Sequence, residues 1–230
     1  MFQTPGIDRA PYPTQYLADV PKVVDVEGRR RELSDALWRI VLRDGMHAVT
    51  VRSVAAEAGV SPGMVQHYFR TQDELIEFAM GEALEQMMAR VARIDLSRPD
   101  PEAALAAMEE VVPLDRQRRA EAEVWLAMLS RRHSGAALER QNELVDSTLA
   151  TTIRAYLQMM LEAGAICPDR DVEVETIRLH ALIDGLSLHA LSEPPMLSPD
   201  QLRAALRAHL ADLVPDVQAS SPTAGSVRRT

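Results

Sequence analysis

The sequence predicts an all-α protein with a small N-terminal helical head and a larger helical body. The composition favours helix, because alanine, leucine, methionine, glutamate and arginine are abundant and only 4% of the 230 residues are aromatic. Apolar residues recur at the spacing of one helical face along most of the chain, and no run of β-branched residues alternates with period two. Proline and glycine clusters separate these stretches.

The two ends of the chain have compositions typical of disorder. Residues 1–27 contain four prolines among mixed polar residues, so we expect a disordered arm. Residues 214–230 are rich in serine, proline, threonine, glycine and arginine, so we expect a disordered tail. Between them we assign residues 28–72 to the head and residues 73–213 to the body.

The first head helix is predicted over residues 28–44. Its apolar positions follow the i, i+3, i+4, i+7, i+8 pattern of one helical face, and Gly45 ends it. Trp38 lies beside this stripe, so we expect it to cover the edge of an interface. The positions on the stripe are Leu33, Ala36, Leu37, Ile40 and Val41.

Residues 50–69, TVRSVAAEAGVSPGMVQHYF, predict two short helices joined by a tight turn. Thr50 caps the first helix, and Gly59 ends it because glycine can adopt the left-handed conformation that turns the chain. Ser61 then caps the second helix, with Pro62 at its first position. The inward face of that helix consists of Val65, Tyr68 and Phe69. This is the layout of a helix-turn-helix, whose second helix enters the major groove of DNA.

The same turn also matches the G-x-S-x-G pattern of a hydrolase nucleophile elbow, with Ser61 as the nucleophile. An elbow needs a buried β-strand directly before the serine, whereas Val51 to Ala58 has helical spacing and an alanine-rich sequence that disfavours strand. We therefore expect no catalytic residue and no enzyme activity. A serine hydrolase is kept as one alternative, and a helical adaptor whose head binds protein is a second.

The body is predicted to begin with a long helix that ends near Ile94 and starts with a capping box of Thr71 and Glu74. The helix predicted over residues 171–192 is apolar on most of its circumference, so we expect it to be buried on nearly all sides. The other body helices are predicted over residues 101–112, 115–130, 134–163 and 199–213.

The formal net charge of -9 lies outside the head. Residues 29–80 contain seven arginines and seven acidic residues, so this segment is neutral. An acidic body joined to a neutral, arginine-bearing head favours contact of the head with phosphates. The cluster of Arg29, Arg30 and Arg31 is a weaker candidate for such contact.

Cysteine, histidine and hydropathy patterns limit the other possible functions. The single cysteine, Cys167, excludes an internal disulfide. The six histidines form none of the short pairs with carboxylates or cysteine that a metal site needs, so we expect no metal and no cofactor. No basic-then-apolar leader and no membrane-spanning run is found, so we expect a soluble, cytoplasmic protein with no membrane contact.

Residues 29–80 resemble the DNA-binding head of the TetR family of bacterial transcriptional repressors. The features that carry the resemblance are Thr50-Val51, Val54-Ala55, Glu57-Ala58-Gly59-Val60-Ser61, Gly63, Tyr68-Phe69 and Thr71-Gln72-Asp73-Glu74-Leu75. In the body, Val112-Pro113-Leu114-Asp115 and Val124-Trp125-Leu126 are similar to the branch that includes the choline-responsive repressors.

The resemblance implies a ligand-responsive repressor that binds a near-palindromic double-stranded DNA operator as a homodimer. It implies phosphate contacts from Thr50, Tyr68, Thr71 and the backbone at Ser61, and it places Arg52, Gly63, Met64, Gln66 and His67 at base edges or the groove wall. Gln66 stands where the family often has tyrosine, and glutamine can pair with adenine. Gln72 stands where the family often has lysine, which weakens the expected grip on phosphates.

The body is implied to bind a small-molecule effector of unknown identity and to form the dimer. Effector binding would pivot the helix from Asp73 to Ile94 and spoil the spacing of the two heads. Methionine and tryptophan can form adaptable apolar pockets, so the candidate pocket residues are Met87, Trp125, Met128, Tyr156, Met159, Met160 and His189, with ordinary core as the alternative for each. The implied four-helix dimer interface uses Ile177, His180, Ala181, Asp184, Leu188, Leu202, Leu206 and His209.

Overall fold

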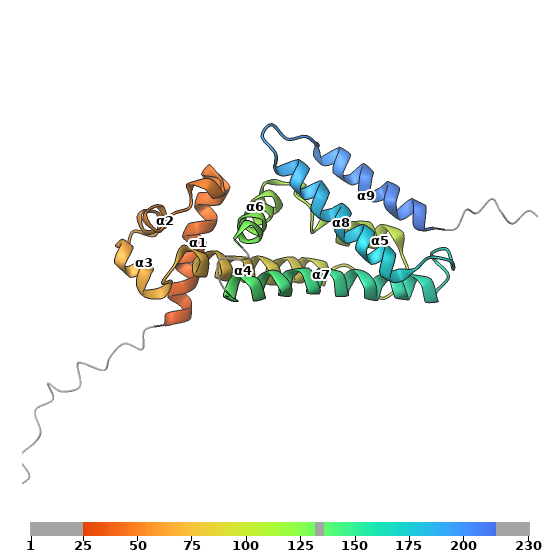
Figure 1. Cartoon of the computed structure of the whole chain (residues 1–230), viewed down its shortest axis with the longest axis horizontal. Helices are drawn as coiled ribbons and strands as arrows, with labels where there is room; N and C mark the ends of the chain where they lie inside the picture. The colour runs from red at the N-terminus through yellow and green to blue at the C-terminus, as the bar shows by residue number, and fades with distance from the viewer. Residues whose placement is uncertain (1–24, 132–135, 215–230) are drawn as a thin grey trace, which may run out of the picture.

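A computed structural model of the chain describes residues 25–131 and 136–214. Within these residues it contains α-helices and one 3-10 helix and no strand, which confirms the all-α fold class (Figure 1). The elements in chain order are α1 (Val26–Asp44), η2 (Met46–Ala48), α2 (Val51–Ala58), α3 (Pro62–Tyr68), α4 (Gln72–Val91), α5 (Pro101–Glu109), α6 (Arg116–Ser130), α7 (Ala136–Glu162), α8 (Val172–Leu191) and α9 (Pro199–Leu213).

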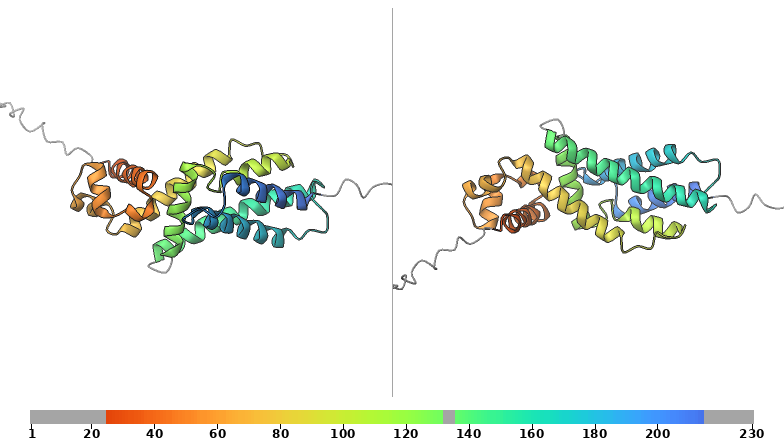
Figure 2. Two further views of the ribbon diagram at one scale, coloured as in Figure 1. Left: turned by 90° about the horizontal axis from the view of Figure 1, so that it is seen from above. Right: turned by 90° about the horizontal axis from the view of Figure 1, so that it is seen from below.

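The head helices α1 to α3 lie at one end of an elongated molecule, and the body helices form the rest (Figures 1 and 2). Helix α4 leaves the head and packs against α6 and α7. Helix α6 also contacts α1, so it lies at the junction of the head and the body. Helices α8 and α9 contact each other, and α8 packs along α7. The described residues include no helix that is long and apolar enough to cross a bilayer.

The helix-turn-helix is built by the local interactions that the sequence predicts. The Thr50 hydroxyl accepts the backbone N–H of Ser53 at 3.0 Å, and the Ser61 hydroxyl accepts that of Met64 at 3.2 Å. Gly59 has a φ of 68°, in the left-handed region that favours glycine. Because α2, and not a β-strand, precedes Ser61, the geometry of a nucleophile elbow is absent at this turn.

The cap of α4 differs from the predicted capping box in one half. The Thr71 hydroxyl accepts the N–H of Glu74 at 3.1 Å, as predicted. The Glu74 carboxylate, however, accepts the backbone N–H of Arg70 at 2.8 Å instead of that of Thr71. The Glu74 side chain therefore binds the backbone one residue before the position that a capping box would use, in the segment between α3 and α4.

Two body helices end before their predicted limits. Helix α4 ends at Val91 and not at Ile94, and α5 ends at Glu109 and not at residue 112. Pro113 disfavours helical backbone at the residue before it, and Val112 is fully buried in the core of the body. Val112 is therefore a core residue, although it lies beyond the end of α5.

Two hydrophobic clusters form the core. The first joins the head to α4, α6 and the start of α7, because Leu75 and Ile76 of α4 and Val124 of α6 are all fully buried in the same cluster as Leu37 of α1. The second joins α5, the later part of α7, α8 and α9. The predicted boundary at residue 72 separates the head from the body along the sequence. The hydrophobic core of the head nevertheless continues across this boundary into α4, α6 and the start of α7.

Helix α8 is less buried than the sequence predicts. Its inner side chains, among them Leu179 and Ile183, belong to the second cluster. Its outer face leaves Val174 49% exposed, Ile177 68% exposed and Leu188 50% exposed. A single protomer thus presents an apolar face on α8, and the expectation of burial on nearly all sides is wrong for one chain alone.

Candidate DNA-binding surface and ligand pocket

The outer face of α3 is the centre of the candidate DNA-binding surface. Gly63, Met64, Gln66 and His67 are all exposed on this helix. Val65 on the opposite face has no exposed surface and anchors the helix on the head core. Four of the five residues predicted for base edges or the groove wall therefore lie together on the outward side of α3, with a buried side chain behind them, and the fifth, Arg52, lies on α2.

The other five predicted contact residues are Ser61 and Tyr68 at the two ends of α3 and Thr50, Arg52 and Thr71 outside it. Thr50, Arg52 and Thr71 are exposed, and Tyr68 is half-buried with its ring 5.0 Å from that of His67 in an edge-to-face arrangement. The hydroxyl of Thr71 accepts a helix N–H, which leaves its own proton free to donate. The same holds for the Ser61 hydroxyl at the start of α3.

Two of the three clustered arginines are held by the head itself. The Arg30 guanidinium lies 4.8 Å from the ring centroid of Phe69 and 4.5 Å from that of Phe78, which is a cation–π geometry. Arg29 forms an ion pair with Glu32 one turn along α1. The structure thus gives Arg30 a packing role that the weaker prediction of phosphate contact did not include.

Glu57 on α2 holds two further arginines. It pairs with Arg39 and with Arg43, both at 2.9 Å, and these hydrogen bonds lower the pKa of the Glu57 carboxyl. By contrast, Arg52 and Arg70 form no ion pair with any residue that the structure describes. Arg70 is exposed directly after α3 and is absent from the predicted set. A basic residue that follows the Tyr-Phe pair at the end of α3 was the signal in the sequence.

Gln72 has a structural role at the base of the helix-turn-helix. Its side-chain amide donates to the carbonyl oxygen of Val49 at 2.8 Å. This hydrogen bond ties the first residue of α4 to the segment just before α2. The departure from the family pattern at residue 72 therefore removes a positive charge and supplies a contact within the head.

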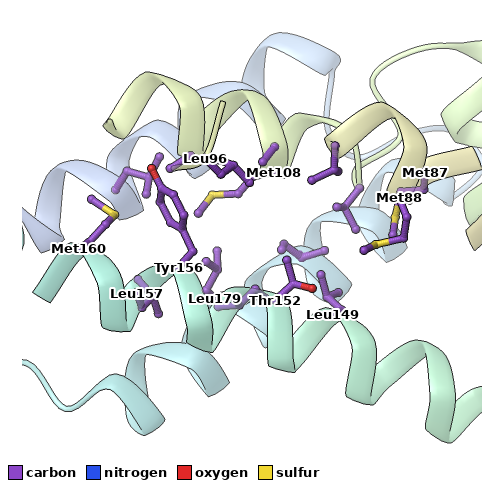
Figure 3. A pocket seen from close by; sticks show the side chains of 17 residues that line it. Met87, Met88, Leu96, Met108, Leu149, Thr152, Tyr156, Leu157, Met160 and Leu179 are labelled. Carbon is purple, nitrogen blue, oxygen red and sulfur yellow. The ribbon is translucent and has the colours of Figure 1, made fainter. Parts of the chain in front are cut away.

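An apolar cavity of about 60 Å³, called the chamber below, lies between α4, α5, α7 and α8, and Leu210 of α9 completes its lining (Figure 3). Three of the predicted pocket residues line it, namely Met87 of α4 and Tyr156 and Met160 of α7. The Tyr156 hydroxyl donates to the Asp100 carbonyl at 2.8 Å and accepts the Asp100 N–H at 3.2 Å. Burial raises the pKa of the Tyr156 hydroxyl.

A second, more polar pocket adjoins the apolar chamber and shares Met87 with it. It contains Trp125 of the predicted set, together with charged side chains that the sequence did not identify. Arg90 pairs with two of them, Glu110 at 2.7 Å and Glu121 at 2.8 Å. The other charged side chains of the lining are Arg118 and Asp184.

Three predicted pocket residues lie elsewhere. Met128 is fully buried in the first hydrophobic cluster, on a face of α6 turned toward the head core. Met159 and His189 line neither of the two pockets, and His189 is exposed. The three residues were included because helical spacing does not tell which side of a helix meets the cavity. In the described ranges no three His, Cys, Asp or Glu side chains gather as a metal site would require.

The predicted dimer residues divide into exposed and buried groups. Ile177, Ala181 and Leu188 are exposed on one face of α8. Leu202 and Leu206 have no exposed surface and belong to the core of their own protomer. A side chain without exposed area has none to offer a partner, so these two leucines stabilise the core of their own chain. His180, Asp184 and His209 are half-buried.

Helix α6 connects the head to α8 through side chains. The Arg116 guanidinium donates twice to the carbonyl oxygen of Leu42, near the end of α1, at 2.6 and 3.0 Å. The Glu123 carboxylate accepts the backbone N–H of Met46 at 2.9 Å. Arg119 lies between these residues on the helix and donates to a carbonyl oxygen at the end of α8 at 2.6 Å.

Comparison with known proteins assigns both regions. Residues 33–78 match the family described as bacterial regulatory proteins, tetR family, and residues 100–215 match the BetI-type transcriptional repressor, C-terminal family. The chain is 34% identical over 196 residues to the HTH-type transcriptional regulator PksA of Bacillus subtilis (strain 168), a match that covers 84% of this chain and 94% of that protein.

Solved structures share the fold of this chain. A transcriptional regulator from Rhodococcus sp. Rha1 is 32% identical, with a TM-score of 0.68 over 81% of this chain and 99% of that one. A regulator from Saccharomonospora viridis, solved in complex with choline, shares the fold with a TM-score of 0.72 at 22% identity, over 83% of this chain and 100% of that one. With these matches across head and body, the chain belongs to the TetR family of bacterial transcriptional regulators and has a BetI-type C-terminal region.

Proposed function

We propose that this repressor binds a near-palindromic operator as a homodimer through α3 of each protomer and leaves it when a small molecule occupies the body. The observation that carries the proposal is the seating of α3. Its exposed residues face outward together, while Val65 and the adjacent Phe69 are buried beneath them. A short helix held in this way can enter the major groove without rearrangement.

Base readout would come from the exposed face of α3. Gln66 can pair with adenine through its amide, and Met64, which is 45% exposed, can contact a thymine methyl group. Arg52 would face a base edge or the groove wall, and Arg70 would contact phosphate, since neither forms an ion pair with another described side chain. Phosphate contacts position the protein, whereas Gln66 and His67 would set the sequence preference.

Dimerisation would use the exposed face of α8. Ile177, Ala181 and Leu188 form an apolar stripe that a second copy of the same helix can cover. Two heads joined in this way would bind half-sites about 34–36 Å apart, or farther for longer spacers.

Effector release would act through α4 and α6. Met87 of α4 lines both pockets, and Arg116 and Glu123 of α6 hold the head. A ligand that displaces α4 or α6 would therefore change the position of the head relative to the dimer axis. The choline bound in the related Saccharomonospora viridis structure supports a small-molecule effector for this fold.

Selection of DNA from a random pool by the full-length protein tests the proposal. We expect a two-fold symmetric sequence, and we expect the double variant Gln66→Ala with His67→Ala to lose its preference for that sequence. Gln86→Ala is the matched control, because Gln86 is exposed on α4 away from α3. A pool that shows no enrichment would contradict DNA binding and would favour a helical adaptor.

A further inference from the structure

We propose that the effector is an uncharged, apolar molecule that lies in the chamber between α4, α5, α7 and α8. This inference rests on the proposed function, because it names the class of molecule that would release the repressor. It also separates this protein from the choline-binding relative, since choline carries a permanent positive charge.

The lining of the chamber is almost entirely hydrocarbon and sulfur. Of the 17 side chains that line it, only Thr152 and Tyr156 carry a polar atom (Figure 3). Four methionines contribute, one pair from α4 and one each from α5 and α7: Met87, Met88, Met108 and Met160. The chamber has a volume of about 60 Å³, so an apolar ligand enters it only when side chains of the lining move aside. Methionine side chains are flexible and polarizable, so they can make this adjustment.

Both polar side chains are already hydrogen-bonded within the protein. The Thr152 hydroxyl donates to the carbonyl oxygen of Thr148 at 2.8 Å. The Tyr156 hydroxyl both donates to and accepts from the backbone of Asp100. A charged ligand in this chamber would lose its hydration and find no charged side chain among the lining residues, which makes its transfer from water unfavourable.

The chamber also lacks the features that recognise a quaternary ammonium. Such cations bind over several aromatic faces or beside a carboxylate, and the lining offers a single aromatic ring, that of Tyr156. The adjoining polar pocket has Trp125 and Asp184, so it is where a cation would go instead. Its other two carboxylates are already neutralised by Arg90.

A ligand in the apolar chamber would touch the helix that leads to the head. Met87 and Met88 lie on α4, one after the other, and face α7 across the chamber. The first turns of α4 belong to the head core through Leu75 and Ile76. Filling the chamber would therefore press on the far end of a helix whose near end is fixed in the DNA-binding head.

The test uses N-phenyl-1-naphthylamine, an uncharged apolar fluorophore, and the full-length protein. We expect its emission to rise on binding and to saturate at one molecule per protomer. Ala107→Phe places a large side chain in the chamber from α5, so we expect it to weaken binding at least tenfold. Ala106→Phe is the matched control, because Ala106 is half-buried on the same helix and does not line the chamber.

A second variant guards against a folding defect in the first. Thr152→Val replaces a hydroxyl of the lining with a methyl group and keeps the shape of the side chain, so we expect it to bind the uncharged fluorophore more tightly than the wild type does. A loss of fivefold or more in Thr152→Val would show that the ligand uses this hydroxyl and would overturn the proposal. Equal binding by wild type and Ala107→Phe would overturn it as well.

Choline chloride tests the opposite hypothesis, namely that the effector is a cation. We expect it not to displace the fluorophore, and we expect Asp184→Asn to leave fluorophore binding unchanged. Displacement by choline that depends on Asp184 would place a cationic effector in the polar pocket and overturn the proposal. DNA binding by the same preparations separates the two claims: a protein that binds its operator but not the fluorophore refutes the effector class alone.

Discussion

The head and the apolar chamber of the body are built in opposite ways. In the head, contacts between residues three positions apart fix each helix, as Thr50 does with Ser53 and Ser61 with Met64, and Val65 behind α3 is fully buried. The chamber is assembled from side chains of α4, α5, α7, α8 and α9, between residues 87 and 210, and is lined by flexible methionines, of which Met88 is 37% exposed. The contrast fits the proposed roles of the two regions, a preformed surface for DNA and an adaptable region for a ligand.

The largest expected effect is the loss of a core side chain in the head. Phe69 is 1% exposed and lies against Arg30 and Phe78, so Phe69→Ala should lower the free energy of unfolding by about 3–5 kcal/mol. Met160→Leu in the chamber keeps the side-chain volume and should cost less than about 1.5 kcal/mol. Urea unfolding measures both, and equal losses would contradict the contrast between the two regions.

The junction between the regions should respond to loss of one carboxylate. Glu123→Ala leaves the Met46 N–H without its acceptor, and this should lower the free energy of unfolding by roughly 1–3 kcal/mol. Glu123→Gln retains an acceptor oxygen and should cost clearly less. Thermal denaturation of the two variants gives the comparison, and an equal cost for both would mean that the hydrogen bond to Met46 contributes nothing.

Two glycines should change stability in opposite directions. Gly59→Ala puts a side chain on a left-handed residue, which costs about 1–2 kcal/mol even though a Cβ would meet no neighbouring atom. Gly81 lies within α4, where a Cβ would make ordinary contact at 3.8 Å, so Gly81→Ala should stabilise the protein by about 0.5–1 kcal/mol. The denaturant midpoints of the two variants show whether each substitution stabilises or destabilises the protein. A stabilising Gly59→Ala would show that the turn before α3 is not held in the conformation described.

The smallest expected effect is a difference in pH dependence. Burial lowers the pKa of His209 in α9 below its ordinary value of 6.5, so the unfolded chain takes up a proton more readily than the folded one. Stability should therefore fall as the pH drops through about 6.5, and His209→Leu should remove this part of the pH dependence. In the head, Arg43 lowers the pKa of Glu57, so its contribution is lost only at acid pH, below 4.5. Unfolding measured from pH 8 down to about pH 2 covers both windows and separates them.

The sequence predicted the head well because its elements depend on neighbouring residues. Gly59, Ser61 and Pro62 each act within one turn of the chain, so their roles are visible without a fold. The packing of Arg30 on Phe69 and Phe78 and the hydrogen bond from Gln72 to Val49 join residues 23 to 48 positions apart, and no local pattern indicates them.

In the body, helical spacing located the helices and could not orient them. Met128 and Met160 are both fully buried methionines, and only the packing of α6 and α7 places one in the head core and the other beside the chamber. Leu202 and Leu206 were assigned to the dimer for the same reason, since an apolar stripe can face its own core or a partner. Asp184, which lines the polar pocket, was likewise assigned only to the interface.

The salt dependence of operator binding tests the central claim most directly. In fluorescence anisotropy titrations of the full-length protein, the logarithm of the affinity should fall linearly with the logarithm of the salt concentration. Arg70→Ala should lower the slope by about one and weaken binding to all sequences alike, whereas Gln66→Ala should leave the slope unchanged and relax the base preference. Binding that does not respond to salt, or a slope that Gln66→Ala changes and Arg70→Ala does not, would contradict the assignment of α3 and its flanks as the DNA-reading surface.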